Sequence, residues 1–383
     1  DSHTIGGIVI GGVYNYMGFF YNITGNISNL NLVYAETSNT YEVADDMGGS
    51  ATIGGLANEC SGSISSVNVY YESELNLGTG FTTAIGGLVG GLLSGATATN
   101  CGVYNFRPII SNIVYTGEDT INVGGIVGSG NGTIVDCYSS SAVIAFSGFD
   151  SVTVGGVIGM SSGTVEGCWF DGQISSNTYN YCGGIVGSGT PAIRHSLFSG
   201  KIYVSSMTSR YCGGILGNGS PIVFNGNISN GTFTSSTNYK DSIGSGSTTD
   251  GANCFYGRTE AMKLASTYSS WADFSNYYAI VPTMNDGYPI LKHFMPMVPV
   301  TGFDGSGTET APYLIKTYQD LLGMSSYYND NSLIETDVYW KLATHIDVSK
   351  DANNALIHFI PICYDKEFDG YFDGNGKTIS GLL

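Results

Sequence analysis

Short stretches in which apolar residues alternate with small polar residues recur along the first two thirds of the chain. Residues 133–138 (TIVDCY) and 164–169 (TVEGCW) are two examples. A period of two residues is typical of β-strands, which expose successive side chains on opposite faces. The pattern therefore predicts many short strands in this part of the chain.

A glycine motif recurs along the same part of the chain. An aliphatic residue or Cys, followed by Gly-Gly and a second aliphatic residue, occurs at Ile5, Ile53, Ile85, Val123, Val154, Cys182 and Cys212. The intervals between the second glycines are 48, 32, 38, 31, 28 and 30 residues, so the unit has about 30 residues and the longer intervals hold insertions. An eighth, degenerate copy is predicted at residues 242–255.

A repeat of this length predicts an all-β fold, a parallel β-helix. A propeller blade needs about 40 to 45 residues, and leucine-rich or ankyrin units need helical segments that the pattern lacks. We expect coils of roughly three short strands stacked about 4.8 Å apart. Glycine is expected at the corners, where neighbouring coils leave no room for a side chain.

Composition and charge narrow the class of protein. The chain has 31 acidic and 13 basic residues and a net charge of −18, which argues against binding to nucleic acid. Hydrophobic residues make up 42% of the chain, enough for a core, while its 56 glycines disfavour helices.

The uncharged residues 5–23 contain five glycines, so we interpret them as a coil of the repeat and not as a membrane span. The start at Asp1 is compatible with a removed signal peptide, and an extracellular or cell-surface location is expected.

Several of these motifs resemble a known group of proteins. The segments IGGLVG (85–90) and VGGIVG (123–128), the Cys-Tyr or Cys-Trp pairs that follow, and NDGYPIL (285–291) are similar to the GLUG-repeat proteins of bacterial and archaeal surfaces. The resemblance implies a structural or adhesive role at the cell surface. Such repeats also occur in some surface peptidases, but the HExxH motif is absent here, and no enzyme activity is predicted.

The chain is expected to divide into four parts. Residues 1–260 carry the repeats, 261–295 form an aromatic closing segment, 296–304 a linker, and 305–383 a cap-like module. Within the last part, residues 317–328 are predicted to form one helix with Leu321, Leu322, Met324 and Ser325 near one face. In GLUG-type proteins a segment similar to this module precedes the first coil as a cap, so the module resembles the start of a further solenoid.

The order of these parts raises the question of what covers the ends. From the order of the motifs, we expect the chain to begin with an uncapped coil and to end with a cap that has nothing to cover. Open strand edges pair with whatever they meet. Either the chain is part of a longer repeat protein, or its tail docks on the first coil of another copy. Docking of this kind builds a filament, tube or sheath unless it closes into a ring. The assembly candidates are Ile5, Ile8, Phe372, Ile379 and Leu382.

The cysteines follow the repeat, but their redox state stays open. Cys137 and Cys168 each lie twelve residues after a second glycine, whereas Cys182 and Cys212 directly precede a Gly-Gly pair. Equivalent residues on adjacent coils lie about 4.8 Å apart, inside the Cα range for a disulfide, but a relaxed bridge needs Cβ atoms about 3.8 Å apart. Two alternatives remain, a ladder of buried thiols or disulfides that join Cys137 to Cys168 and Cys182 to Cys212.

The sequence contains only weak evidence for glycosylation or for catalysis. Six sequons occur, at Asn22, Asn26, Asn131, Asn218, Asn227 and Asn230, about as many as chance predicts for this composition.

A polysaccharide lyase or hydrolase would need a pair of carboxylates or a base placed beside its substrate. Asp136, Asp150 and Asp171 share no repeat position, and a contact between Glu166 and Arg194 is as easily an exposed ion pair. We therefore predict no catalytic, cofactor-binding or metal-binding residues.

The tyrosine content supports the main alternative function, binding of carbohydrate. The chain has 27 tyrosines, many on or beside predicted strands. Tyr presents a large apolar face with a polar tip, which suits both subunit interfaces and stacking on sugars. The expected partners are other copies of the chain and surface glycans, without nucleic acid or a membrane span. The sequence therefore predicts an extracellular structural or adhesive protein that assembles head to tail, or alternatively a carbohydrate-binding adhesin.

Overall fold

The computed structural model describes residues 3–8, 12–13, 16–35, 40–42, 51–72, 74–77, 82–110, 121–144, 152–176, 181–204, 211–234, 239–240, 242–245, 254–282, 284–297, 302–330, 337–348, 362–363 and 367–381. The chain divides into two compact units, residues 1–258 and 259–383. Each unit is described by itself.

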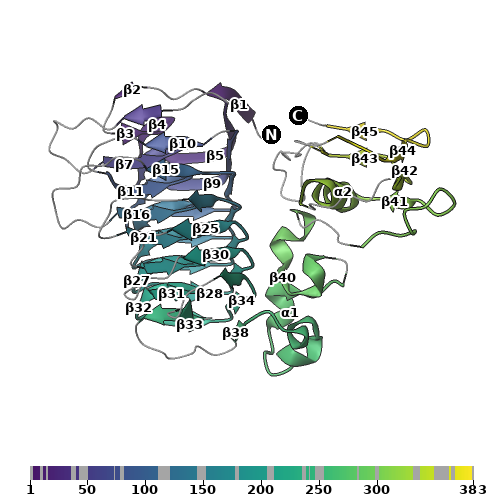
Figure 1. Cartoon of the computed structure of the whole chain (residues 1–383). Helices are drawn as coiled ribbons and strands as arrows, with labels where there is room; N and C mark the ends of the chain where they lie inside the picture. The colour runs from purple at the N-terminus through teal and green to yellow at the C-terminus, as the bar shows by residue number, and fades with distance from the viewer. Residues whose placement is uncertain are drawn as a thin grey trace. The chain divides into compact units, whose positions relative to one another are not determined.

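The first unit is a parallel β-solenoid, as the repeat predicts (Figure 1). Every strand pair between its described residues is parallel, and each strand pairs with its equivalents on the coils before and after it. A complete coil is formed by β21 (Val152–Gly155), β22 (Ile158–Ser161), β23 (Thr164–Glu166), β24 (Trp169–Phe170) and β25 (Gln173–Ser176). The coil therefore has five short strands and not three, because a glycine pair and a residue with positive φ add two further corners.

The other strands take the same places on neighbouring coils. Equivalents of β21 are β3 (Tyr16–Met17), β7 (Ala51–Gly54), β11 (Thr82–Gly86), β16 (Ile121–Gly124), β26 (Tyr181–Gly183), β31 (Tyr211–Gly213) and β36 (Tyr239–Lys240). Equivalents of β22 are β4 (Phe20–Ile23), β8 (Ala57–Cys60), β12 (Val89–Leu92), β17 (Val127–Gly130), β27 (Val186–Gly189), β32 (Leu216–Gly219) and β37 (Ile243–Ser245).

A 14-stranded sheet holds the equivalents of β23 and β24. It begins with β1 (His3–Ile8), β5 (Asn26–Tyr34) and β9 (Ser63–Tyr71). It continues as one branch with β13 (Thr97–Thr99), β18 (Thr133–Val135), β28 (Ala192–Arg194) and β33 (Val223–Asn225), and a second with β14 (Gly102–Tyr104), β19 (Tyr138–Ser139), β29 (Leu197–Phe198), β34 (Ile228–Ser229) and β38 (Phe255–Tyr256).

Two four-stranded sheets complete the described coils. One contains β25 with β20 (Ala142–Ile144), β30 (Lys201–Val204) and β35 (Thr232–Thr234). The other contains β2 (Gly12–Val13), β6 (Thr40–Glu42), β10 (Leu75–Leu77) and β15 (Pro108–Ile110).

The strand register corrects the position of the first repeat. In the column of the glycine motif, the residue paired with Ile53 is Met17, so Met17-Gly18 takes the place expected for Ile5-Gly6. Ile5 instead pairs with Leu32 in the 14-stranded sheet. The registered residues of the column are Met17, Ile53, Ile85, Val123, Val154, Cys182, Cys212 and Tyr239, which lie 27 to 38 residues apart. The interval of 48 residues is therefore not a coil length, because Gly7 does not belong to this column. The predicted eighth copy does form strands that pair with the coil before it.

Glycine is required in this column by the spacing of the coils. A Cβ atom at Gly156 would overlap the carbonyl oxygen of Gly184 on the next coil and the ring of Phe170. A Cβ atom at Gly184 would likewise overlap the carbonyl oxygen of Gly214. The second glycine of each motif therefore lets one coil lie directly on the next.

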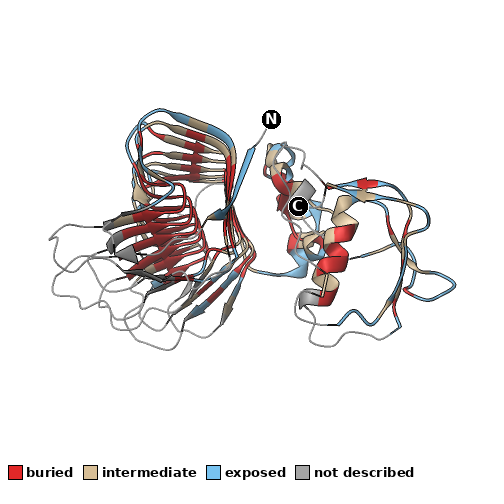
Figure 2. Cartoon of the chain, turned by 90° about the horizontal axis from the view of Figure 1, so that it is seen from above, coloured by how far each residue is buried: buried red, intermediate tan, exposed pale blue. Residues whose placement is uncertain are grey.

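The core consists of ladders of equivalent apolar residues inside the coils, which Figure 2 shows as buried positions along successive strands. Phe170 and Phe198 are fully buried and stack with ring centroids 6.1 Å apart. Tyr34 and Tyr71 stack in the same way at 5.1 Å. Because every apolar residue packs on its own equivalent, the core grows by one layer with each coil.

A ladder of small polar side chains lines the corner between β23 and β24 and its equivalents. The residue before each side chain has positive φ, for example Asp136 before Cys137 and His195 before Ser196. The backbone N–H of Cys101 lies 3.4 Å from Cys137 Sγ, and the N–H of Ser196 donates to Asn227 Oδ1 at 3.0 Å. The corner side chains therefore supply acceptors for backbone groups that the turn removes from the strand ladder.

The first part of the second unit is a compact aromatic segment. Its elements are η1 (Glu260–Lys263), η2 (Ala265–Tyr268), α1 (Phe274–Tyr277), β39 (Tyr278–Ala279), η3 (Asn285–Gly287), β40 (Ile290–Leu291) and η4 (Lys292–Met297). β39 and β40 are antiparallel, and Tyr268 stacks on Phe274 at 4.2 Å with Trp271 beside them. This segment does not continue the coils.

The rest of the second unit repeats the solenoid pattern on a small scale. β41 (Tyr313–Ile315), β42 (Tyr339–Leu342) and β44 (Tyr371–Asp373) form one parallel sheet, and β43 (Ile346–Asp347) and β45 (Ile379–Ser380) form another. Registered partners in these sheets lie 27, 32 and 33 residues apart, close to the spacing of the coils. Residues about one coil apart in sequence therefore pair in this module as they do in the first unit.

One helix covers these small sheets. α2 (Tyr318–Asp330) lies within two residues of the predicted helix. Leu321, Met324 and Ser325 are buried, whereas Leu322 is partly exposed. Asp320 Oδ2 accepts the backbone N–H of Thr317 at 2.8 Å, a capping interaction that fixes where the helix begins.

Candidate functional site

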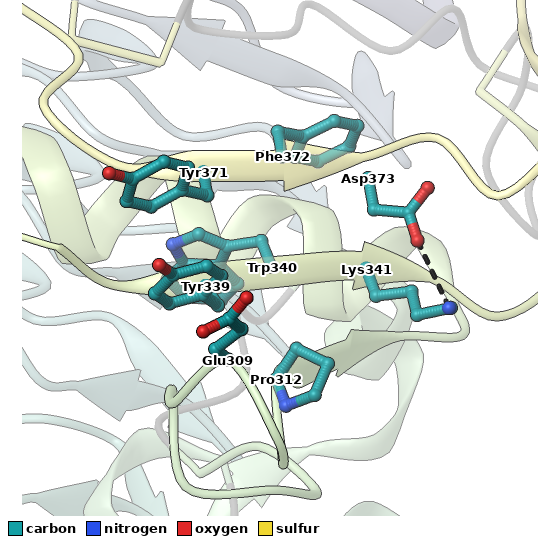
Figure 3. A pocket seen from close by; sticks show the side chains of 8 residues that line it. All are labelled: Glu309, Pro312, Tyr339, Trp340, Lys341, Tyr371, Phe372 and Asp373. Atoms are coloured by element: carbon teal, nitrogen blue, oxygen red, sulfur yellow. Dashed lines mark ion pairs between the residues drawn. The ribbon is translucent and has the colours of Figure 1, made fainter.

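A pocket on the small sheet of the second unit is the candidate site (Figure 3). Its volume is about 350 Å³, and it is lined by Glu309, Pro312, Tyr339, Trp340, Lys341, Tyr371, Phe372 and Asp373. These residues come from the loop before β41, from β42 and from β44. The register pairs Tyr339 with Tyr371 and Lys341 with Asp373, so equivalent positions of two coils form the pocket.

The aromatic part of the pocket is a pair of stacked rings. The centroids of Tyr339 and Tyr371 lie 4.3 Å apart, with an angle of 10° between the planes. Tyr371 is 52% exposed. Loss of contact with water, followed by the neighbouring Tyr371, raises the pKa of Tyr339 above its ordinary value. The hydroxyl of Tyr339 is therefore neutral near pH 7 and can donate and accept hydrogen bonds.

The charged part of the pocket lies beside the rings. Lys341 Nζ and Asp373 Oδ2 form an ion pair at 3.0 Å. The ammonium of Lys341 and the backbone N–H of Asn375 lower the pKa of Asp373, so this carboxylate is charged across the neutral range. Glu309 is exposed and forms no ion pair among the residues that the structure describes. The charge of the lining groups is therefore negative by one unit.

The indole N–H of Trp340 is not directed into the pocket. Trp340 Nε1 donates to the hydroxyl of Tyr328 at 2.9 Å, and both side chains are buried in the core beneath the sheet. The pocket therefore lacks the indole N–H as a donor. Its polar atoms are carboxylate oxygens, tyrosine hydroxyls and an ammonium group already paired.

Sequence reasoning did not find this site. The signal was present as two segments with the same pattern, Tyr-aromatic-charged, at residues 339–341 and 371–373, which lie one coil apart. Two matching segments separated by 32 residues are easy to overlook where the glycine motif of the repeat is absent. Only the register shows that they are neighbours.

The assembly candidates within the described residues lie on three edge strands, β1, β44 and β45. Ile5 on β1 is 38% exposed, and Phe372 on β44 is 40% exposed. Ile8 and Ile379 are half-buried and pack against the cores of their own units. Leu382 lies outside the described residues.

Within the described ranges, β1 pairs only with β5, β44 only with β42, and β45 only with β43. The structure therefore places four of the five candidates on strands with one unpaired edge.

All eight cysteines are free thiols in the structure. Cys182 and Cys212 are registered partners, and Cys137 belongs to the corner ladder with Cys101 and Cys168. Burial raises the pKa of the Cys101 and Cys137 thiols, and a hydrogen bond with Cys212, followed by burial, raises that of Cys182. The structure joins no pair of these cysteines, and six of the eight are small buried side chains, so the proposed disulfide pairings stay predictions.

The sequons differ in accessibility. Asn22, Asn26 and Asn131 are exposed, and Asn218 is half-buried. Asn227 and Asn230 are fully buried, and Asn227 holds the corner ladder with a hydrogen bond to the backbone oxygen of Ile193 at 3.1 Å. A glycan cannot occupy these two positions in the folded chain, so their candidacy was wrong.

Of the residues considered for catalysis, the structure brings Glu166 and Arg194 together. Glu166 and Arg194 are registered neighbours, and Glu166 Oε1 lies 3.6 Å from Nδ1 of the buried His195. Asp136 lies in the corner before β19, Asp171 follows β24, and Asp150 falls outside the described residues. No group of three potential ligands for a metal ion occurs in the described parts of the chain. No described helix has both the length and the apolar character needed to cross a bilayer.

Asp171 is the one carboxyl among the described residues whose pKa is raised strongly. Burial raises its pKa to about 7, although the hydroxyl of Tyr138 donates to both oxygens at 2.9 and 3.0 Å. Between about pH 4 and pH 7 the folded chain holds a proton that the unfolded chain has lost, so stability falls as pH rises through this window.

We expect Asp171→Asn to remove this part of the pH dependence. Relative to the native chain, the variant is expected to gain about 2 kcal/mol of stability between pH 4.5 and pH 8, a figure reduced for solvent screening because Asp171 is only half-buried. Thermal unfolding at both pH values measures the difference, with the exposed Glu367→Gln as the control. Equal pH profiles for the native chain and Asp171→Asn would show that Asp171 titrates normally.

Comparisons with known proteins add little to this geometry. No protein-family model matches the chain, and no curated protein matches it significantly. Among solved structures, the chain is similar to a protein from Bacteroides ovatus described as a candidate immunoglobulin A1 protease. The two share 17% identity with a TM-score of 0.38, and the match covers 76% of each chain. A similarity at this level carries no argument about function, and membership of the GLUG-repeat group stays a prediction.

Proposed function

We propose that the chain is a non-catalytic extracellular surface protein with a structural or adhesive role, which joins other copies end to end. The observation that supports the proposal is the pair of solenoid edges described above. β1 in the first unit and β44 with β45 in the second have one row of backbone groups that no described strand satisfies.

Both edges are suited to the same kind of partner. Each belongs to parallel sheets whose successive strands lie about 4.8 Å apart, so a strand from another copy can extend the sheet in register. Ile5 and Phe372 add exposed apolar surface beside these edges. A contact between two different edges can repeat, and it builds a filament where the repeated rotation does not close into a ring.

The composition is consistent with such a role. Charged residues make up only 11% of the chain, so few solvated groups would lose water when two copies meet. The net charge of −18 opposes association elsewhere on the surface. Together these properties favour contact at particular edges over unspecific aggregation.

Electron microscopy of the native chain at neutral pH is expected to show filaments or tubes. Phe372→Lys should abolish or strongly shorten them, because a lysine on an edge strand must lose its water to be covered. Met160→Lys is the matched control, since Met160 is 45% exposed on β22 in the middle of the solenoid. Monodisperse native particles, or filaments that Phe372→Lys leaves intact, would refute assembly through β44.

A carbohydrate-binding adhesin is the second candidate. The pocket with stacked tyrosines favours it, because aromatic rings beside hydrogen-bonding groups suit sugars. This function does not require assembly.

A further inference from the structure

We propose that β45 of one copy replaces β1 on the β5 strand of another copy, while β44 pairs with the first half of that same β5. The inference specifies the contact between copies and rests on the assembly in the proposed function. It names β5, and not the outer edge of β1, as the strand that receives the second unit of another copy.

β1 and β45 have the same sequence pattern and the same backbone turn. Residues 3–8 (HTIGGI) and 377–382 (KTISGL) share Thr-Ile, then a small residue, Gly and an aliphatic residue. Gly7 and Gly381 take equivalent places in the two segments, and their φ angles are 71° and 78°. A left-handed residue at the same place turns both strands in the same way. Either segment can therefore fit the place that β1 occupies.

The open sides of the two strands are complementary. Among the described residues β1 pairs with β5, where Ile5 lies beside Leu32, and β45 pairs with β43, where Ile379 lies beside Ile346. If β45 takes the place of β1, Ile379 lies beside Leu32. β43, β45, β5 and β9 then follow one another in one parallel sheet, because β5 already pairs with β9 on its other side.

β5 also has an unpaired stretch that β44 fits. β1 reaches only residues 30–34 of β5, although β9 pairs with β5 from Asn26 onward. On the side away from β9, no described strand pairs with residues 26–28. These residues precede 30–34 across a corner at Asn29, with φ of 55°, and β44 likewise precedes β45 across one turn. β44 and β45 together therefore match both halves of β5, whereas β1 matches only one.

The apolar side chains at this junction cover one another. Phe372 lies on the same face of its sheet as its buried partner Trp340, yet it is 40% exposed. Ile27 on β5 is only half-buried, although its partner Ile64 on β9 is fully buried. With β44 beside the first half of β5, Phe372 lies on Ile27, and both side chains lose contact with water.

The exchange gains more pairing than it loses. β45 remakes the backbone pairs that β1 gives up, and β44 adds pairs that β1 cannot make. Exchange of equivalent elements between copies is a low-cost route to assembly for this reason. Each copy receives a tail on its first unit and donates one from its second, so the contact can repeat from copy to copy.

Deletion of residues 1–8 distinguishes exchange from pairing on the outer edge of β1. We expect the shortened chain to form filaments at a concentration at least tenfold lower than the full chain does, because β1 no longer has to be displaced. If the outer edge of β1 were the contact, the deletion would abolish filaments. Sedimentation and electron microscopy measure the threshold, and circular dichroism checks that the shortened chain is folded.

Two substitutions in the shortened chain control for unspecific association of the bared strand. Phe372→Lys should prevent filaments, because it places a charge against Ile27. Met160→Lys should leave them unchanged, since Met160 is 45% exposed on β22 in the middle of the solenoid.

Cross-linking of the full-length chain tests the register directly. On the outer face of the joined sheet, the exposed residues Ser28 and Asp373 become neighbours when Phe372 lies on Ile27. Copies with Ser28→Cys are mixed with copies with Asp373→Cys and treated with a short bis-maleimide, and adducts of two chains are expected. Ser188→Cys on β27 replaces Ser28→Cys in the matched control, and the native chain shows the background from its own cysteines.

The outcomes separate this inference from the assembly itself. Filaments of the full chain that disappear on deletion of residues 1–8 would overturn the exchange and leave end-to-end assembly intact. Cross-linking of Ser28→Cys no stronger than that of Ser188→Cys, in samples that contain filaments, would also overturn it. Absence of filaments from both the full and the shortened chain would refute assembly, and the exchange with it.

Discussion

Gly156→Ala is expected to destabilise the solenoid by about 3 kcal/mol. The added Cβ would overlap the carbonyl oxygen of Gly184 and the ring of Phe170. The first of these is backbone of the next coil, so it cannot rotate away as a side chain could. The two coils must separate, and the hydrogen bond from the N–H of Gly156 to the oxygen of Gly183, 3.1 Å long, is strained with them.

Gly25→Ala is the control for the loss of glycine itself. A Cβ at Gly25 meets no atom within 4 Å, so this substitution is expected to change stability by less than about 0.5 kcal/mol. Thermal and urea unfolding followed by circular dichroism compare the two variants. Hydrogen exchange should place the loss of protection in the coils of β21 and β26. Similar midpoints for both variants would mean that the coils are not as closely stacked as the structure shows.

Phe198→Ala is expected to cost about 4 kcal/mol of stability. The side chain is fully buried, its ring stacks on Phe170 at 6.1 Å, and its ring centroid lies 5.9 Å from that of Phe233 at an angle of 65°. Truncation removes contacts with the coils on both sides and leaves a cavity. The backbone ladders around it are rigid, so the cavity can collapse only partly.

Denaturant unfolding of Phe198→Ala measures this cost, with Tyr203→Ala as an exposed aromatic control on the same coil. Phe198→Leu should recover most of the lost stability, because it refills the cavity with an apolar side chain. A loss below about 1 kcal/mol in Phe198→Ala would contradict the ladder of packed rings. Since each coil contacts only its neighbours, the effect should be confined to the adjacent coils.

The parts of the fold that sequence analysis recovered are those with a local or periodic signal. The spacing of Gly-Gly motifs from Ile53 to Cys212 predicts coils of about 30 residues, and the register confirms these positions. The helix at α2 follows from apolar residues at helical spacing. Both patterns can be recognised from the order of nearby residues, without knowing which distant segments pair.

The errors lie where two local signals compete. Ile5-Gly6-Gly7 has the motif, yet Met17-Gly18 occupies the column, because the chain between them forms strands that pair elsewhere. Asn227 reads as a surface sequon, but the corner ladder buries it. The count of three strands per coil missed the corners formed by single residues with positive φ.

The sequence by itself therefore determined the parallel β-helix, the length of its coils and the absence of side chains at the stacked glycines, since each depends on a pattern repeated every coil. Only the tertiary structure decided which residues share a rung, that six of the eight cysteines are buried, and that Tyr339, Tyr371, Lys341 and Asp373 form one pocket. The reason is physical. A rung joins residues about 30 positions apart through backbone hydrogen bonds, which every residue except proline can form, so side-chain identity alone does not specify the register.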